Sequence, residues 1–218
     1  MRWAHREAII RGGGENRLMV PSEVLAEETP SGVRHAAVSE ARSTEWHYFH
    51  MPNVSQSNAV FRVEGTLEDA MRVKQDRISW RVPLDDETTV SFSIDLTHVT
   101  GEEGEAYRAR RRASEALAGQ FQPPEMGNAI LAGKVQERDL DRRLSTATMF
   151  SVEDYLAQVG QHHPDHSLDR LGRMDTGVHL LRKVWERELR ALHEGRPLTQ
   201  WASPGAAIEM TAQMAGAR

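Results

Sequence analysis

The order of segments along the chain is the feature that most constrains the fold. Segments typical of strands fill the first hundred residues, and segments typical of helices follow them. Runs rich in β-branched or aromatic residues, divided by turn signals, lie at 23–27, 33–38 and 46–51. Ile78–Val82 and Val90–Leu96 alternate apolar and polar residues around a polar turn, which predicts an antiparallel hairpin.

The second half of the chain predicts helices. Residues 102–119 are rich in Glu, Arg and Ala, which favours a helix that Gln122-Pro123-Pro124 stops. We interpret residues 125–150 mostly as loop with a short helical piece. Near the end of the chain, apolar residues recur at spacings of three and four, which predicts a last helix with these residues on one face. They are Val178, Leu181, Trp185, Leu189 and Leu192. Asp175 or Thr176 is expected to cap its start, and Gly195 followed by Pro197 to mark its end.

These patterns predict an α+β fold, an antiparallel sheet with a long C-terminal helix packed on one face. We expect one domain over residues 1–200 and a tail over 201–218, since no repeat or composition shift marks an internal boundary.

Composition removes several function classes. The chain has no cysteine, which excludes disulfides, thiolate catalysis and an iron–sulfur cluster held by this chain. Net charge is −5 with interspersed signs, so no nucleic-acid partner is expected; the basic run Arg108–Arg112 follows acidic residues and is typical of a solvated helix face. No membrane span is expected, and residues 1–7 are too charged for a signal peptide, so we expect a cytoplasmic protein.

The ten histidines are the candidate metal ligands. His162, His163, Asp165 and His166 could ligate zinc or iron, but Pro164 between them favours a polar connecting loop. Metal-dependent hydrolysis at this cluster stays open as an alternative. His47 and His50 lie at odd spacing on one strand, so they face opposite sides of the sheet and cannot share a ligand.

Several motifs between residues 49 and 183 follow one another in a recognisable order. They are Phe49-His50-Met51-Pro52-Asn53, Trp80–Asp86, Val152–Gln158 with Gln161, Asp165–Gly172, Asp175–Val178 and Leu181-Arg182-Lys183. Together they resemble the C-terminal catalytic domain of the large (alpha) subunit of Rieske non-haem iron ring-hydroxylating oxygenases, in the phthalate-dioxygenase-like group.

The resemblance implies a helix-grip fold, in which a curved antiparallel sheet grips the long C-terminal helix, and a mononuclear Fe(II) held by two histidines and one carboxylate. Asp154 matches the carboxylate and is the expected catalytic and metal-binding residue. His5 matches one of the histidines, and the segment with the other is not in the chain. The N-terminal Rieske domain, whose [2Fe-2S] cluster the complete enzyme needs, is absent as well, so residues 1–200 are expected to be an N-terminally incomplete catalytic domain.

The function implied by the resemblance is insertion of oxygen from O2 into an aromatic or related substrate, by a fragment or split subunit. The implied partners are the apolar substrate, O2, a reductase or ferredoxin, and further copies in a homotrimer. Candidates for lining an apolar pocket, with core packing as the alternative role, are Trp46, Phe49, Phe92 and Ile94. The alternative function is a non-catalytic carrier of an apolar small molecule on the same helix-grip shape.

Overall fold

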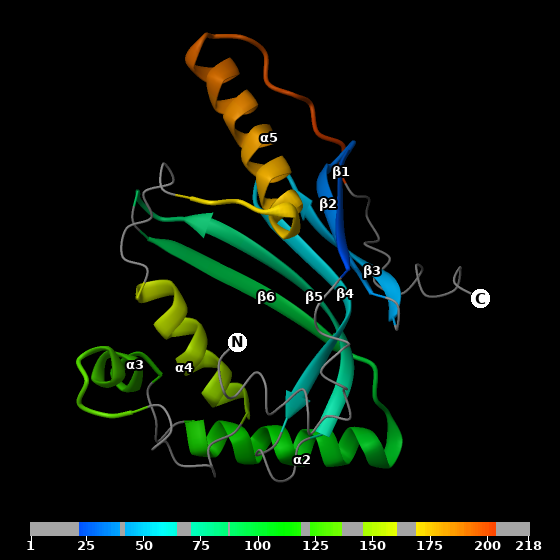
Figure 1. Ribbon diagram of the computed structural model, residues 1–218. Helices are drawn as coiled ribbons and strands as arrows, with labels where there is room; N and C mark the ends of the chain where they lie inside the picture. Colours follow the sequence, from blue (N-terminus) through cyan, green and yellow to red (C-terminus); the bar gives the residue numbers. More distant parts are fainter. Residues whose placement is uncertain are drawn as a thin grey trace. The chain divides into compact units, whose positions relative to one another are not determined.

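The computed structural model describes residues 22–39, 42–64, 71–86, 88–118, 123–136, 146–160 and 169–203 (Figure 1). Within these residues no helix is long and apolar enough to cross a membrane.

Six strands form one antiparallel sheet in which the spatial order equals the chain order. They are β1 (Glu23–Thr29), β2 (Gly32–Ser39), β3 (Arg42–His50), β4 (Val54–Glu64), β5 (Met71–Pro83) and β6 (Thr89–Thr97). β1 and β6 are therefore the two edges of the sheet. The predicted hairpin is confirmed, because β5 pairs with β6 in an antiparallel register from Gln75↔Thr97 to Pro83↔Thr89.

The helices follow the strands, as the sequence predicts. They are α2 (Gly101–Ala118), α3 (Pro123–Leu131), α4 (Thr146–Val159) and α5 (Thr176–His193), with a short 3-10 turn, η4 (Arg173–Asp175), before α5. The predicted α+β class, a curved antiparallel sheet with a long C-terminal helix packed on it, is confirmed, and α5 contacts β1 and β2 (Figure 1). The interpretation of 125–150 as mostly loop is wrong at both ends of that range. Pro123 and Pro124 begin α3 because the first helical turn needs no backbone donor there.

The chain divides into two compact units. The sheet unit comprises residues 17–60, 75–97 and 170–218, and it contains most of the sheet together with η4 and α5. The helical unit comprises residues 1–16, 61–74 and 98–169, and it contains α2, α3 and α4.

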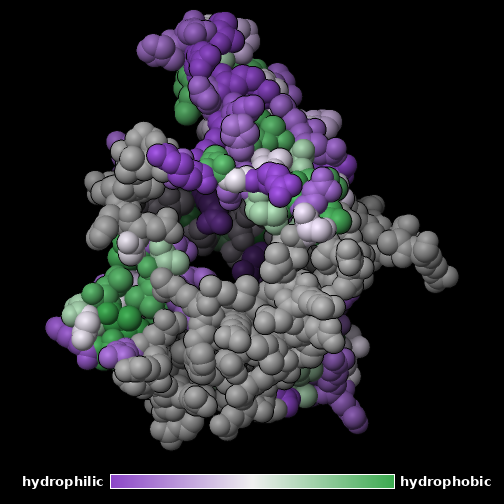
Figure 2. Space-filling model, in the orientation of Figure 1, coloured by the Kyte–Doolittle hydropathy of each residue, from purple (hydrophilic) through white to green (hydrophobic). Residues whose placement is uncertain are grey.

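In the helical unit, α4 packs against α3 and α2. Val152 and Leu156, one turn apart on α4, are buried. Gly127 of α3 permits close approach, because a Cβ there would lie 2.3 Å from Cδ1 of Tyr155. The Tyr155 hydroxyl donates a hydrogen bond of 2.9 Å to the Asn128 side-chain oxygen. Apolar surface gathers over α3 (Figure 2), where Leu131 is exposed.

In the sheet unit, the buried face of α5 is not the apolar series that the sequence pattern singles out. Val184, Glu188 and Ala191 are buried, at spacings of four and three. Leu189 and Leu192 are 56% and 63% exposed. Leu181 and Trp185 of the apolar series are half-buried beside this face, whereas Leu189 and Leu192 point away from it.

The ends of α5 are set by local hydrogen bonds. Asp175 occupies the N-cap position but makes no side-chain capping bond; its carboxylate accepts a 2.8 Å bond from the Gly172 amide instead. At the other end Gly195 has φ of 66°, its amide donates to Leu192 O, and the Arg196 amide donates to Ala191 O. This is the Schellman arrangement that glycine favours, so the predicted helix end at Gly195 is confirmed.

Candidate functional site

Asp154 lies on α4 with its side chain exposed. Its neighbours Val152 and Glu153 are buried, so α4 turns Asp154 away from the core of the helical unit. A carboxylate is a suitable iron ligand. Among the described residues, however, no group of three or more His, Asp or Glu side chains converges to hold a metal ion. The described residues therefore bring no two histidines to Asp154.

The remaining predicted ligands lie outside the described residues. His5, and the cluster of His162, His163 and His166, fall in the ranges 1–21 and 161–168. The predicted tail beyond residue 203 lies outside them as well.

A pair of histidines that the sequence analysis did not select lies on neighbouring strands of the sheet unit. His35 of β2 and His47 of β3 are direct cross-strand partners, and their rings stack with centroids 5.3 Å apart. His47 Nδ1 is 2.9 Å from the Ser57 hydroxyl of β4. Burial lowers the pKa of both imidazoles, and His35 lowers that of His47 further. Both rings are therefore neutral near pH 7.

The first turn of α5 lies directly against His35 of this pair. A Cβ on Gly177 would be 3.0 Å from both Cβ and Cγ of His35, so a larger residue would force the two elements apart. The glycine of the Asp175-Thr176-Gly177 motif thus has a packing role: it lets α5 approach β2.

His50 is fully satisfied inside the sheet unit. It is 6% exposed, and its Nδ1 is 2.9 Å from the Ser31 hydroxyl. Its Nε2 is 2.9 Å from the Gln56 side-chain oxygen, which can only accept, so Nε2 carries the proton and Nδ1 accepts from Ser31. With both ring nitrogens engaged, His50 has no lone pair for a metal. The described hydrogen bonds of His47 and His50 go to different residues, Ser57 for His47, and Ser31 and Gln56 for His50.

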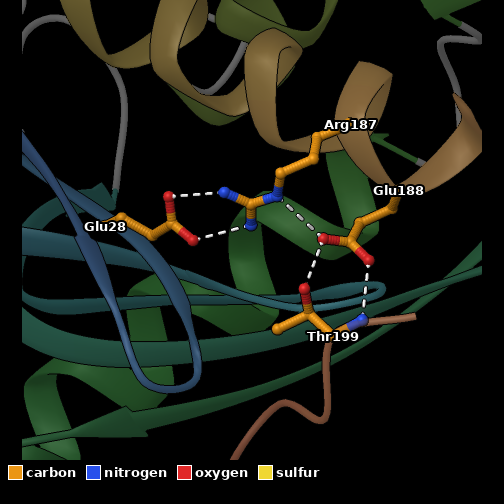
Figure 3. A network of polar contacts seen from close by, with 4 residues as sticks. All are labelled: Glu28, Arg187, Glu188 and Thr199. Atoms are coloured by element: carbon orange, nitrogen blue, oxygen red, sulfur yellow. Dashed lines mark hydrogen bonds and ion pairs between the residues drawn. The ribbon is translucent and has the colours of Figure 1, made fainter. Parts of the chain in front are cut away.

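A polar network links β1 to α5, and α5 to the segment that follows it (Figure 3). Arg187 makes two hydrogen bonds to the Glu28 carboxylate, at 3.0 and 2.7 Å, and one of 3.1 Å to Glu188. The Thr199 amide and hydroxyl donate to the two oxygens of Glu188, at 2.9 and 2.7 Å. These bonds lower the pKa of Glu188, and hydrogen bonding to Glu28, then to Glu188, raises the pKa of Arg187.

The extended segment continues along the sheet unit beyond this network. The Trp201 ring lies 5.6 Å from the Arg187 guanidinium, and the Ala202 amide donates a 2.8 Å bond to Pro30 O. The segment is thereby tied to the β1–β2 turn, whose next residue, Ser31, bonds to His50. Because Glu28 and Arg187 are 159 residues apart in sequence, no local pattern could have predicted their contact.

The four residues proposed to line an apolar pocket do not share one environment. Phe92 and Ile94 are each 59% exposed on β6. Trp46 and Phe49 are half-buried, and their odd spacing on β3 places them on opposite faces of the sheet. Trp46 also carries the Arg34 guanidinium over its ring, 4.2 Å from the centroid.

A scan against models of protein families and a search of curated proteins both return no match. The resemblance to ring-hydroxylating oxygenases therefore rests on the residues of this chain alone.

Proposed function

We propose that the chain is the catalytic portion of a ring-hydroxylating oxygenase, a fragment or split subunit that inserts oxygen from O2 into an aromatic or related substrate at a mononuclear non-haem iron. Asp154 is the carboxylate ligand in this proposal, and His5 is one histidine ligand. The iron would supply the activation of dioxygen. The [2Fe-2S] cluster and the reductase or ferredoxin would belong to the complete enzyme, since this chain has no cysteine to hold a cluster.

The observation that carries the proposal is the match between the motif order and the elements of the fold. The motif with Asp154 falls on α4, the Asp175-Thr176-Gly177 motif falls at the start of α5, and the Trp80–Asp86 motif falls at the turn from β5 to β6. An α+β fold with a C-terminal helix on an antiparallel sheet is the architecture that the resemblance implies.

The contact between Gly177 and His35 gives one of these motifs a physical reason. It brings the first turn of α5 against His35 of β2, whose ring stacks on that of His47 of β3.

Anaerobic loading with ferrous iron, followed by desalting and metal analysis, tests the proposal. We expect the wild-type chain to retain iron and Asp154→Ala to lose most of it. Glu125→Ala, which removes an exposed carboxylate from α3 of the same unit, is the matched control and should retain iron like the wild type. Unchanged iron content in Asp154→Ala would overturn the assignment of that ligand.

The alternative function, a metal-free carrier of an apolar small molecule, gives the opposite result in the same experiment. A carrier would retain no iron but would bind an environment-sensitive apolar fluorophore. That combination would replace the oxygenase proposal.

A further inference from the structure

The two edges of the sheet are protected to very different degrees. β1 carries Glu23, Glu27 and Glu28, and α5 contacts it. β6 has no lysine and no proline, and its single charge, Asp95, is paired with Arg77 of β5 at 2.6 Å. Charged residues, proline and covering helices are the means by which proteins prevent an edge strand from pairing with another chain. Within the part of the chain that the structure describes, β6 is therefore the more weakly protected edge.

β6 also presents apolar side chains to solvent. Phe92, Ile94 and Leu96 are 59%, 59% and 47% exposed, and their even spacing places them on one face of the strand. Val90 lies on the same face, opposite Val82 of β5, which is itself 37% exposed. A row of exposed apolar residues on an unprotected edge is typical of a protein interface.

The direction of the β6 backbone groups that do not bond to β5 follows from the β5–β6 ladder. The Leu84 amide bonds to Thr88 O, and the His98 amide bonds to Lys74 O, so the even-numbered residues of this stretch bond to β5. Bonding alternates along an antiparallel strand. The odd-numbered residues Ser91, Ser93 and Asp95 therefore direct their amides and carbonyls outward, away from β5.

We propose that two copies of this chain associate through β6, with the two strands antiparallel and Ser93 facing the partner's Ser93. The outward groups of the odd-numbered residues then form the hydrogen-bonded pairs of a continuous sheet. Phe92 lies opposite the partner's Ile94, and Val90 lies opposite the partner's Leu96. Every apolar residue of the face thus meets an apolar residue, as an isologous two-fold interface requires.

The alternative registers that keep the same bonding pattern are less favourable. A two-fold axis at Asp95 would place two carboxylates directly opposite each other, which destabilises a strand pair. An axis at Ser91 would place Ile94 opposite the partner's Thr88 and Leu96 opposite the partner's Asp86. The axis at Ser93 instead places Asp95 opposite the partner's Ser91, whose hydroxyl can donate to it.

Sedimentation velocity of the full chain over a range of concentrations tests the association. We expect a concentration-dependent dimer in the wild type. Ile94→Lys, which places an ammonium opposite the partner's Phe92, should raise the dissociation constant at least about tenfold. Leu189→Lys, on the exposed side of α5 at nearly the same exposure, is the matched control and should dimerise like the wild type. A wild type that stays monomeric, or a dimer or trimer that Ile94→Lys leaves unchanged, would overturn the proposal.

Cross-linking tests the register, because the chain has no cysteine of its own. Two Cα atoms in a hydrogen-bonded antiparallel pair are about 5.5 Å apart, within the range of a disulfide. Ser93→Cys should therefore form a disulfide-linked dimer on mild oxidation. Ser91→Cys should not, because position 91 of the two copies would be displaced by four residues, roughly 13 Å along the strand. Efficient cross-linking through position 91 would overturn the register. The dimer does not depend on the oxygenase proposal, so iron retention and dimerisation can succeed or fail separately.

Discussion

The buried face of α5 gives a prediction of stability that separates the structure from the sequence pattern. Val184 is 1% exposed on this helix, whereas Leu192, a larger residue of the predicted apolar series, is 63% exposed. We expect Val184→Ala to destabilise the sheet unit far more than Leu192→Ala, although the leucine substitution removes more atoms.

The expected magnitudes follow from burial. Val184→Ala removes two methyl groups, each worth about 0.8 kcal/mol on burial, and the cavity term raises the total to about 2–3 kcal/mol. Complete burial of a leucine is worth about 1.5–3 kcal/mol, so a side chain roughly one third buried contributes about 0.5–1 kcal/mol. Alanine's higher helix propensity offsets part of that loss. The free-energy difference for Leu192→Ala is therefore expected below about 1 kcal/mol.

Urea unfolding followed by tryptophan fluorescence measures both changes, because Trp185 lies on α5 itself and Trp201 lies in the segment tied to it. The unfolding midpoint should fall clearly for Val184→Ala and little for Leu192→Ala, with the slope unchanged in both. Equal losses, or a larger loss for Leu192→Ala, would refute the buried face described above.

Three further predictions follow from the sheet unit. Since hydrogen bonds from Thr199 lower the pKa of Glu188, its carboxylate stabilises the fold above the unfolded pKa of about 4.3, and this contribution is lost as pH falls through the folded pKa. The stability advantage of wild type over Glu188→Gln should thus shrink in acid, and a constant advantage would contradict the network. Burial lowers the pKa of His47, so the neutral ring's contribution to stability is complete above about pH 6.5 and is lost as pH falls. Between about pH 7 and 5, urea titration should therefore show a larger loss of stability for the wild type than for His47→Asn. Parallel losses in the two proteins would contradict this. Gly177→Val should cost about 1–3 kcal/mol in the same urea assay, because its Cβ would meet His35 at 3.0 Å, and an unchanged midpoint would show that α5 does not approach β2 so closely.

The elements that the sequence predicts correctly are those that local patterns determine. Alternation within Ile78–Val82 and Val90–Leu96 reports the pleat of each strand directly, so the β5–β6 hairpin could be predicted. Gly195 marks the end of α5 because a left-handed backbone conformation is a local requirement.

The features that the sequence analysis missed depend on contacts between distant residues. The apolar spacing on α5 identifies a stripe, but the sheet surface decides which side is buried, and Gly177 and Ala191 favour the side with smaller residues. His35 stands alone in its strand, and only the β2–β3 register brings it to His47. The Arg187–Glu28 contact likewise requires the folded chain.

The candidate site shows the same difference between what the sequence indicates and what only the folded chain brings together. The choice of Asp154 came from a resemblance in motif order, and the structure places this residue on the exposed surface of α4. The stacking of His35 on His47, with Gly177 of α5 against His35, is visible only in the structure.

The measurement that tests the central claim most directly is the electron paramagnetic resonance spectrum of the chain after anaerobic loading with ferrous iron and addition of nitric oxide. A mononuclear non-haem iron with an open coordination position gives a characteristic ferrous–nitrosyl signal. The oxygenase account predicts this signal in the wild type and in Glu125→Ala, and its loss in Asp154→Ala. Absence of the signal from the wild type, or the same signal with and without Asp154, would contradict the account.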